Sequence, residues 1–135
     1  GNFTQLQEVF FNIIDNSYDA IMQRQTEMNE EGFKGTLEIA AEIFGGDIKI
    51  HIRDNGMGVK KEDLQKLFTP FFTTKATSKK GTGLGLYVIR QIIEEYHGGK
   101  VEFYSVHQKG SETIITLPVY VDKVAEENPN LSLSS

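Results

Sequence analysis

The chain has 135 residues, a length that suits one domain with its own hydrophobic core. Lys and Arg number 14 against 19 Asp and Glu, and the net charge of -5 disfavours nucleic acid as a partner. The absence of Cys excludes a disulfide framework and a thiolate metal site. No signal-peptide pattern is visible in these residues, and no apolar run approaches the about 18 residues that a membrane span needs.

The first half of the chain alternates between helix and strand patterns. Residues 4–24 have helical periodicity without Gly or Pro, and Thr4 is the candidate N-terminal cap. Residues 36–44 and 47–54 alternate apolar and polar side chains, which predicts two strands. The Gly-Gly pair at 45–46 predicts a tight hairpin between them.

The second half has a similar order. Residues 60–67 predict a short helix, and residues 84–96 predict a long helix that Gly98 closes. Residues 100–107 and 111–119 predict a second hairpin. Four strands in two hairpins, with two long helices, predict an α+β sandwich in which the helices cover one face of the sheet.

A polar stripe runs along the first predicted helix. Its members have short amide or carboxylate side chains within about a 100° sector of the helical wheel, and they are Glu8, Asn12, Asp15, Asn16 and Asp19. Amide and carboxylate oxygens are hard donors of the kind that Mg²⁺ prefers. The alternative is an ordinary solvated helix face.

The sequence DNGMG follows the second predicted strand. The Asp54 carboxylate at the strand end could accept a hydrogen bond from an amine. Gly56 and Gly58 permit positive φ and close approach to the backbone. The alternative is a plain strand-ending turn, because Asp-Asn-Gly is also good turn chemistry.

A glycine-rich stretch, GTGLGL at 81–86, leads into the second long helix. Unpaired N–H groups at a helix N-terminus attract anions, so the stretch is either a phosphate cradle or a flexible joint. It is neither the dinucleotide fingerprint nor a Walker loop. The preceding loop has three lysines that could fold over an anion: Lys75, Lys79 and Lys80.

Together these features supply the parts of an ATP–Mg²⁺ site, and their order is that of a known family. The sequence resembles the ATP-binding catalytic domain of sensor histidine kinases, in the superfamily shared with gyrase, heat-shock protein 90 and MutL. The matching motifs are NIIDNSYDA (12–20), DNGMG (54–58), LFTPFFTTK (67–75) and GTGLGL (81–86). The resemblance covers residues 5–119, and it is strongest to the nitrogen-regulation and sporulation type.

The resemblance implies a role for each matching residue. Asn16 would hold Mg²⁺ with Asn12 beside it, Asp54 would accept from the adenine amino group, and Lys75 would neutralise phosphate. Asn12, Asn16 and Lys75 would be the catalytic residues. The implied nucleotide-binding residues are Asn12, Asn16, Asp19, Asp54, Gly56, Gly58, Phe68, Phe72, Thr74, Lys75, Gly81, Thr82, Gly83, Leu84, Gly85 and Leu86.

The resemblance also implies a two-layer α/β sandwich, the Bergerat fold, with a mixed but mostly antiparallel sheet. The family's first strand is missing from this sequence, so the expected sheet either has four strands instead of five or recruits another segment at its edge. We expect the catalytic domain to cover residues 1–121 and residues 122–135 to form a poorly ordered tail.

The implied reaction is phosphoryl transfer to a partner histidine. ATPases of the superfamily have a Glu where this chain has Asn12, and an amide cannot act as a general base. Asp15 could be argued as a substitute base. Alternatives are a protein serine kinase of the anti-sigma or dehydrogenase-kinase type, and a module that only binds ATP.

We expect the chain to be a fragment of a cytoplasmic kinase, whose parent could be anchored to a membrane. Its partners would be the parent's phosphoacceptor and dimerisation domain and a response regulator. None of the three histidines (His51, His97 and His107) resembles a phosphoacceptor. The isolated chain is therefore expected to be a monomer without membrane contact, to bind ATP and Mg²⁺, and not to label itself.

Overall fold

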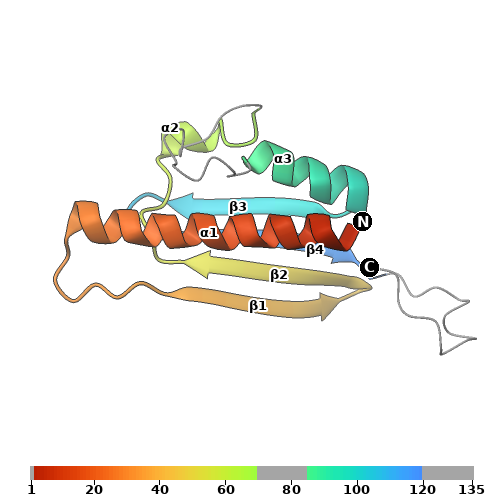
Figure 1. Ribbon diagram of the computed structural model, residues 1–135, viewed down its shortest axis with the longest axis horizontal. Coiled ribbons are helices and arrows are strands. Elements are labelled where there is room, and N and C mark those ends of the chain that lie inside the picture. The colour runs from red at the N-terminus through yellow and green to blue at the C-terminus, as the bar shows by residue number, and fades with distance from the viewer. Residues whose placement is uncertain (1, 70–84, 120–135) are drawn as a thin grey trace, which may run out of the picture.

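The computed structural model describes residues 2–69 and 85–119, which form a sheet with helices packed on one of its faces (Figure 1). The elements in chain order are α1 (Asn2–Met28), β1 (Leu37–Phe44), β2 (Asp47–Asp54), α2 (Lys61–Leu64), α3 (Leu86–Gln91), the π-helical segment η1 (Ile92–Tyr96), β3 (Lys100–Val106) and β4 (Gly110–Pro118). The predicted two-layer α+β fold is confirmed. None of the helices in the described part of the chain has the length and apolar character that a bilayer span requires.

Helix α1 is longer at both ends than the predicted range of 4–24. It begins at Asn2, so Thr4 lies inside the helix and the prediction that Thr4 caps it is wrong. Nothing at residues 2 and 3 breaks a helix, which lets the helical backbone extend past Thr4. Asn29 follows the last helical residue with φ of 45°, a left-handed conformation that Asn tolerates and that ends a helix.

The sheet has the strand order β1-β2-β4-β3, and the pairs among these described strands are all antiparallel, so the expected antiparallel part of the sheet is present without the parallel pair that a mixed sheet has. Gly45 and Gly46 connect β1 to β2 with φ of 56° and 88°, as expected for the predicted tight hairpin. The second predicted hairpin, β3 and β4, is also present. The four strands expected from the sequence are therefore the four that the described residues form.

The second long helix differs from its predicted range of 84–96. Gly85 precedes the helix in an extended conformation, α3 begins at Leu86, and the chain widens into a π-helical turn from Ile92. Gly98 has φ of 65°, which confirms its prediction as the C-terminal cap. The short helix predicted at 60–67 is shorter, Lys61–Leu64, because the chain then turns and buries Leu67.

The hydrophobic core lies between the helices and the inner face of the sheet. Its buried residues come from α1, α3, η1 and three strands, and they are Val9, Ile13, Ile52, Ile89, Ile92, Ile93, Val101 and Ile115. Strand β1 lies at the sheet edge beyond this core, and all eight of its residues are exposed. The core therefore fixes α1 and α3 over β2, β4 and β3, the strands that surround the candidate site.

Candidate functional site

The polar stripe of α1 lies on the flank of the helix that does not enter the core. Asn12, Asp15, Asn16 and Asp19 are partly buried, and Glu8 is exposed. The Asn12 side-chain nitrogen donates to the Glu8 carbonyl at 2.8 Å, which orients the amide along the helix. The predicted amide and carboxylate face is therefore present on one helix, with oxygen donors suited to a hard cation.

Asp54 ends β2 beneath α1, and its side chain is almost wholly enclosed, with a relative exposure of 7%. Burial raises the pKa of this carboxyl group, because a charge loses solvation in the protein interior. Three donors oppose that shift: the Gly56 amide at 2.8 Å, the Ser17 hydroxyl and the Ser111 amide. The carboxylate is thus held in one orientation by α1, by the turn after β2 and by β4.

Ser17 is a site residue that the sequence reasoning missed. On the helical wheel Ser17 falls among apolar residues, between Ile13 and Ile21, which by itself suggests core packing. In the structure it is buried on α1 and donates to Asp54. A serine on an apolar helix face is a signal that could have been used, since a buried hydroxyl needs a partner.

The glycines of the DNGMG turn allow close packing against the protein itself. A Cβ on Gly56 would lie 2.6 Å from the Ala20 carbonyl carbon, and the neighbouring Met57 amide donates to the Ala20 oxygen at 2.9 Å. Gly58 has φ of 72°, and a Cβ there would overlap the Val106 carbonyl. The close approach predicted at these glycines is therefore made by α1 and by the β3–β4 hairpin.

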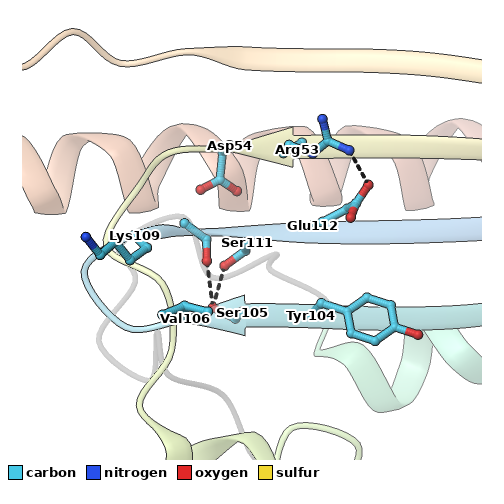
Figure 2. A pocket seen from close by; sticks show the side chains of 9 residues that line it. Arg53, Asp54, Tyr104, Ser105, Val106, Lys109, Ser111 and Glu112 are labelled. Atoms are coloured by element: carbon cyan, nitrogen blue, oxygen red, sulfur yellow. Dashed lines mark hydrogen bonds and ion pairs between the residues drawn. The ribbon is translucent and has the colours of Figure 1, made fainter.

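Figure 2 shows the hairpin side of this turn, with Asp54 pointing toward Ser111 and the end of β3. The Ser105 hydroxyl lies 2.8 Å from the Ser111 hydroxyl and 3.1 Å from the Gly110 carbonyl. The Val59 amide donates to Ser105 at 2.8 Å. These bonds tie the turn after β2 to the hairpin, so the support of Asp54 comes from two separate parts of the chain.

Three predicted residues lie at the borders of the described segments: Phe68, Gly85 and Leu86. Phe68 is half-buried and packs against the hydrophobic core. The Arg90 guanidinium of α3 lies 5.2 Å from the centre of the Phe68 ring, within cation–π range. Leu86 also packs against the core, and the Gly85 carbonyl accepts from the Val88 and Ile89 amides at 3.1 Å.

Several predicted residues fall in 70–84, outside the described residues. They are Phe72, Thr74, Lys75, Gly81, Thr82, Gly83 and Leu84. The part of the site that the structure brings together therefore comprises the polar face of α1 and the buried Asp54.

The described part of the site defines a class of protein: a two-layer α+β domain with an amide- and carboxylate-lined helix and a buried carboxylate at a strand end. The family model "Histidine kinase-, DNA gyrase B-, and HSP90-like ATPase" matches residues 1–121. The chain belongs to this family, as an ATP-binding catalytic domain of the sensor histidine kinase type.

Named relatives support the same assignment. The chain is 36% identical to sensor histidine kinase ZraS of Escherichia coli (strain K12) over 88% of its length, and 37% identical to sporulation kinase B of Bacillus subtilis (strain 168) over 87%. It spans only 23% and 24% of these two proteins.

Solved structures agree with the sequence matches. The catalytic domain of histidine kinase ThkA superposes with a TM-score of 0.64 at 31% identity, covering 85% of this chain and 67% of that one. A second match is ThkA in complex with the response regulator TrrA, at 27% identity and a TM-score of 0.62, covering 87% of this chain and 29% of that one.

Proposed function

We propose that this chain binds ATP with Mg²⁺ and donates the γ-phosphoryl group to a histidine on a separate phosphoacceptor domain of its parent kinase. The partner for the next step is a response regulator, as in the complex that ThkA forms with TrrA. We place this reaction in the cytoplasm, where ATP is available.

The buried Asp54 carboxylate is the observation that supports ATP most directly. An acceptor with 7% exposure, fixed by donors from three elements, suits recognition of an exocyclic amine such as the adenine 6-amino group. A carboxylate that served only to end a strand would gain nothing from this burial, because desolvation disfavours its charged form.

The donor set on α1 fits Mg²⁺. Asn12 and Asn16 lie one helical turn apart and are both partly buried, and Asp19 lies on the same flank. We assign Asn16 as the ligand and Asn12 as its neighbour in the site. Mg²⁺, when bound, neutralises the charge of the triphosphate.

Transfer to a partner is better supported than hydrolysis. At the position where hydrolytic members of the superfamily have a glutamate, this chain has Asn12, and an amide is not a base at neutral pH. A histidine acceptor needs little help from a base, because neutral imidazole is already nucleophilic. The sensor histidine kinase relatives favour histidine as the acceptor over the hydroxyl group of a serine.

The remaining assignments complete the proposed site. Lys75 and Thr74 would contact phosphate, Phe72 would pack beside Phe68, and the glycine-rich stretch 81–86 would present amides to the triphosphate. Gly81, Gly83 and Gly85 fit that role because they have no Cβ.

The test is ATP binding by calorimetry with and without Mg²⁺, for the chain and for Asn16→Ala. We expect the wild-type chain to bind ATP more tightly with Mg²⁺ and Asn16→Ala to lose most of this difference. Adding the parent's phosphoacceptor domain with ³²P-labelled ATP should then give acid-labile phosphate on that domain. Unchanged Mg²⁺ dependence in Asn16→Ala would contradict the metal assignment, and acid-stable phosphate would contradict the histidine acceptor.

A further inference from the structure

We propose that Arg24 is the positioning residue for base recognition: it holds the turn after β2 so that Asp54 faces the base in a fixed orientation. This inference rests on the proposed function of Asp54 as the acceptor for the adenine amine. It adds a residue outside the four motifs that carry the family resemblance.

Arg24 lies near the end of α1, and its side chain has a relative exposure of only 14%. One guanidinium nitrogen, Nη1, donates to the Asn55 carbonyl at 2.9 Å and to the Lys109 carbonyl at 3.2 Å. Asn55 belongs to the turn after β2, and Lys109 to the β3–β4 hairpin. A single side chain therefore joins α1 to two segments that are far apart in the sequence.

The other nitrogens of the guanidinium are held by the loop between α1 and β1. Nε and Nη2 lie 2.8 and 3.3 Å from the two carboxylate oxygens of Glu30. The Phe33 ring lies against the guanidinium, with its centre 4.6 Å from the central carbon. A two-point ion pair and a ring contact restrict the rotation of Arg24, so its Nη1 has one direction in which to donate.

The two carbonyls that Arg24 binds belong to residues close in sequence to Asp54 and to Ser111, one of the residues that hold the Asp54 carboxylate. Asn55 is the following residue, and its side chain is itself fixed by bonds of 2.7 and 2.8 Å to the Thr36 amide and the Lys34 carbonyl. Lys109 is two residues before Ser111, whose amide binds the Asp54 carboxylate. Figure 2 shows Lys109, Ser111 and Asp54 together at this end of the sheet.

A lysine at position 24 cannot make all the contacts of the Arg24 guanidinium. An ammonium has one nitrogen, which cannot pair with both Glu30 oxygens and reach two carbonyls in fixed directions, whereas the arginine fork does. We therefore expect Arg24→Lys to keep the charge but to loosen the turn that carries Asp54.

The test compares two nucleotides: ATP, and purine riboside triphosphate, which has hydrogen in place of the 6-amino group. In Arg24→Lys and Arg24→Gln we expect the Kd for ATP to rise about tenfold, the effect of losing one hydrogen bond to a charged group. The Kd for the purine analogue should change less than about twofold, because that ligand makes no bond to Asp54. Circular dichroism checks that each variant is folded. A result from one folded variant, Arg24→Lys or Arg24→Gln, is enough to test the proposal.

Controls separate this proposal from the proposed function and from a general loss of stability. Arg53→Lys changes an arginine on the open face of the sheet that pairs with Glu112 at 2.9 Å, and we expect no change in the ratio of the two affinities. Equal losses for both nucleotides in the Arg24 variants, or no loss for either, would overturn the positioning role. A wild-type chain that binds neither nucleotide, or both equally, would instead contradict the proposed function.

Discussion

At Asp54, burial and hydrogen bonding act on the carboxyl group in opposite directions. Burial raises its pKa, and the bonds from Gly56, Ser17 and Ser111 favour the charged form. The net pKa is raised, so protonation of the Asp54 carboxylate begins at a higher pH than for an ordinary, solvated aspartate.

This raised pKa predicts how ATP recognition depends on pH. As the pH falls toward the raised pKa of Asp54, protonation of the carboxylate should weaken the bond to the adenine amine, and this weakening should begin at a higher pH than an ordinary aspartate would give. The measurement is the ratio of the Kd for purine riboside triphosphate to the Kd for ATP, in which the titration of the shared triphosphate cancels. We expect the ratio to shrink toward acid pH, and a constant ratio would show that Asp54 does not read the amine.

The sequence predicted Asp54 but not the residues that hold it. A carboxylate next to two glycines is visible in the order of residues. The bond from Ser17 depends on how α1 crosses the end of β2, and the Arg24 bonds depend on the backbone path of two turns. Long-range contacts of this kind have no local pattern, since partners such as Arg24 and Lys109 are distant in the sequence.

At the scale of elements, the contact between α1 and the turn after β2 allows no extra atom. In Gly56→Ala the new Cβ would lie 2.6 Å from the Ala20 carbonyl carbon and 2.8 Å from the Ile21 nitrogen. We expect the free energy of unfolding to fall by about 1–3 kcal/mol, as for other overpacked sites, because the obstructing atoms are backbone atoms and the Ala20 Cβ, which cannot rotate away. Urea denaturation measures the change.

The matched control for Gly56→Ala is Gly45→Asn in the first hairpin. Gly45 has φ of 56° and open space around it, and Asn tolerates this conformation. The control should change stability by less than about 1 kcal/mol. If Gly56→Ala lowered the free energy of unfolding no more than the control does, α1 would not pack on the turn as closely as described.

On the open face of the sheet, His51 of β2 bridges the strands on either side. Its ring nitrogens lie 3.1 Å from Glu42 of β1 and 3.0 Å from Glu112 of β4. The hydrogen bonds to Glu42 and Glu112 raise the pKa of His51 in the folded state. Protonated His51 therefore stabilises the folded chain. This contribution is fully present below the unfolded-state pKa of about 6.5, and it is lost as the pH rises through the higher folded-state pKa.

This linkage predicts that the contact between β1 and β2 contributes more to the stability of the chain at mildly acid pH than at alkaline pH. Between about pH 6 and pH 8.5, the free energy of unfolding of the wild-type chain should fall more than that of His51→Gln, which has no titrating group at this position. Urea denaturation at both pH values measures the difference. A variant with the same pH slope as the wild type would show that His51 does not stabilise the sheet through its charge.

The sequence predicted the order and type of the main elements because their signals are local. Alternating isoleucines and a Gly-Gly pair define the first hairpin, and Gly98 marks the end of the second helix. The π-helical turn at Ile92–Tyr96 was not predicted, because apolar spacing does not distinguish an inserted residue from regular helix. The cap prediction for Thr4 was wrong for a similar reason. A residue that is a good N-terminal cap can also lie inside a helix when no residue before it ends the helix.

At the scale of the whole molecule, one core fixes both helices that flank the proposed site. Ile89 of α3 and Val9 of α1 are fully buried against Ile52 and Ile115 of the sheet. The polar flank of α1 and the start of α3 are therefore set by one packed layer. Such a frame suits a reaction in which the chain mainly positions a nucleotide and neutralises its charge.

The position of the three histidines in this frame predicts where phosphate will not appear. Both ring nitrogens of His51 are engaged by carboxylates, and the Nε2 of His97 is buried at the end of η1, without a hydrogen-bond partner among the described residues. His107 lies in the turn after β3. None presents an imidazole nitrogen on an accessible helix face, so we expect the isolated chain to incorporate far less than stoichiometric ³²P from labelled ATP. Stoichiometric acid-labile label that disappears in one of the variants His51→Gln, His97→Gln or His107→Gln would place the acceptor inside this chain and overturn transfer to a separate domain.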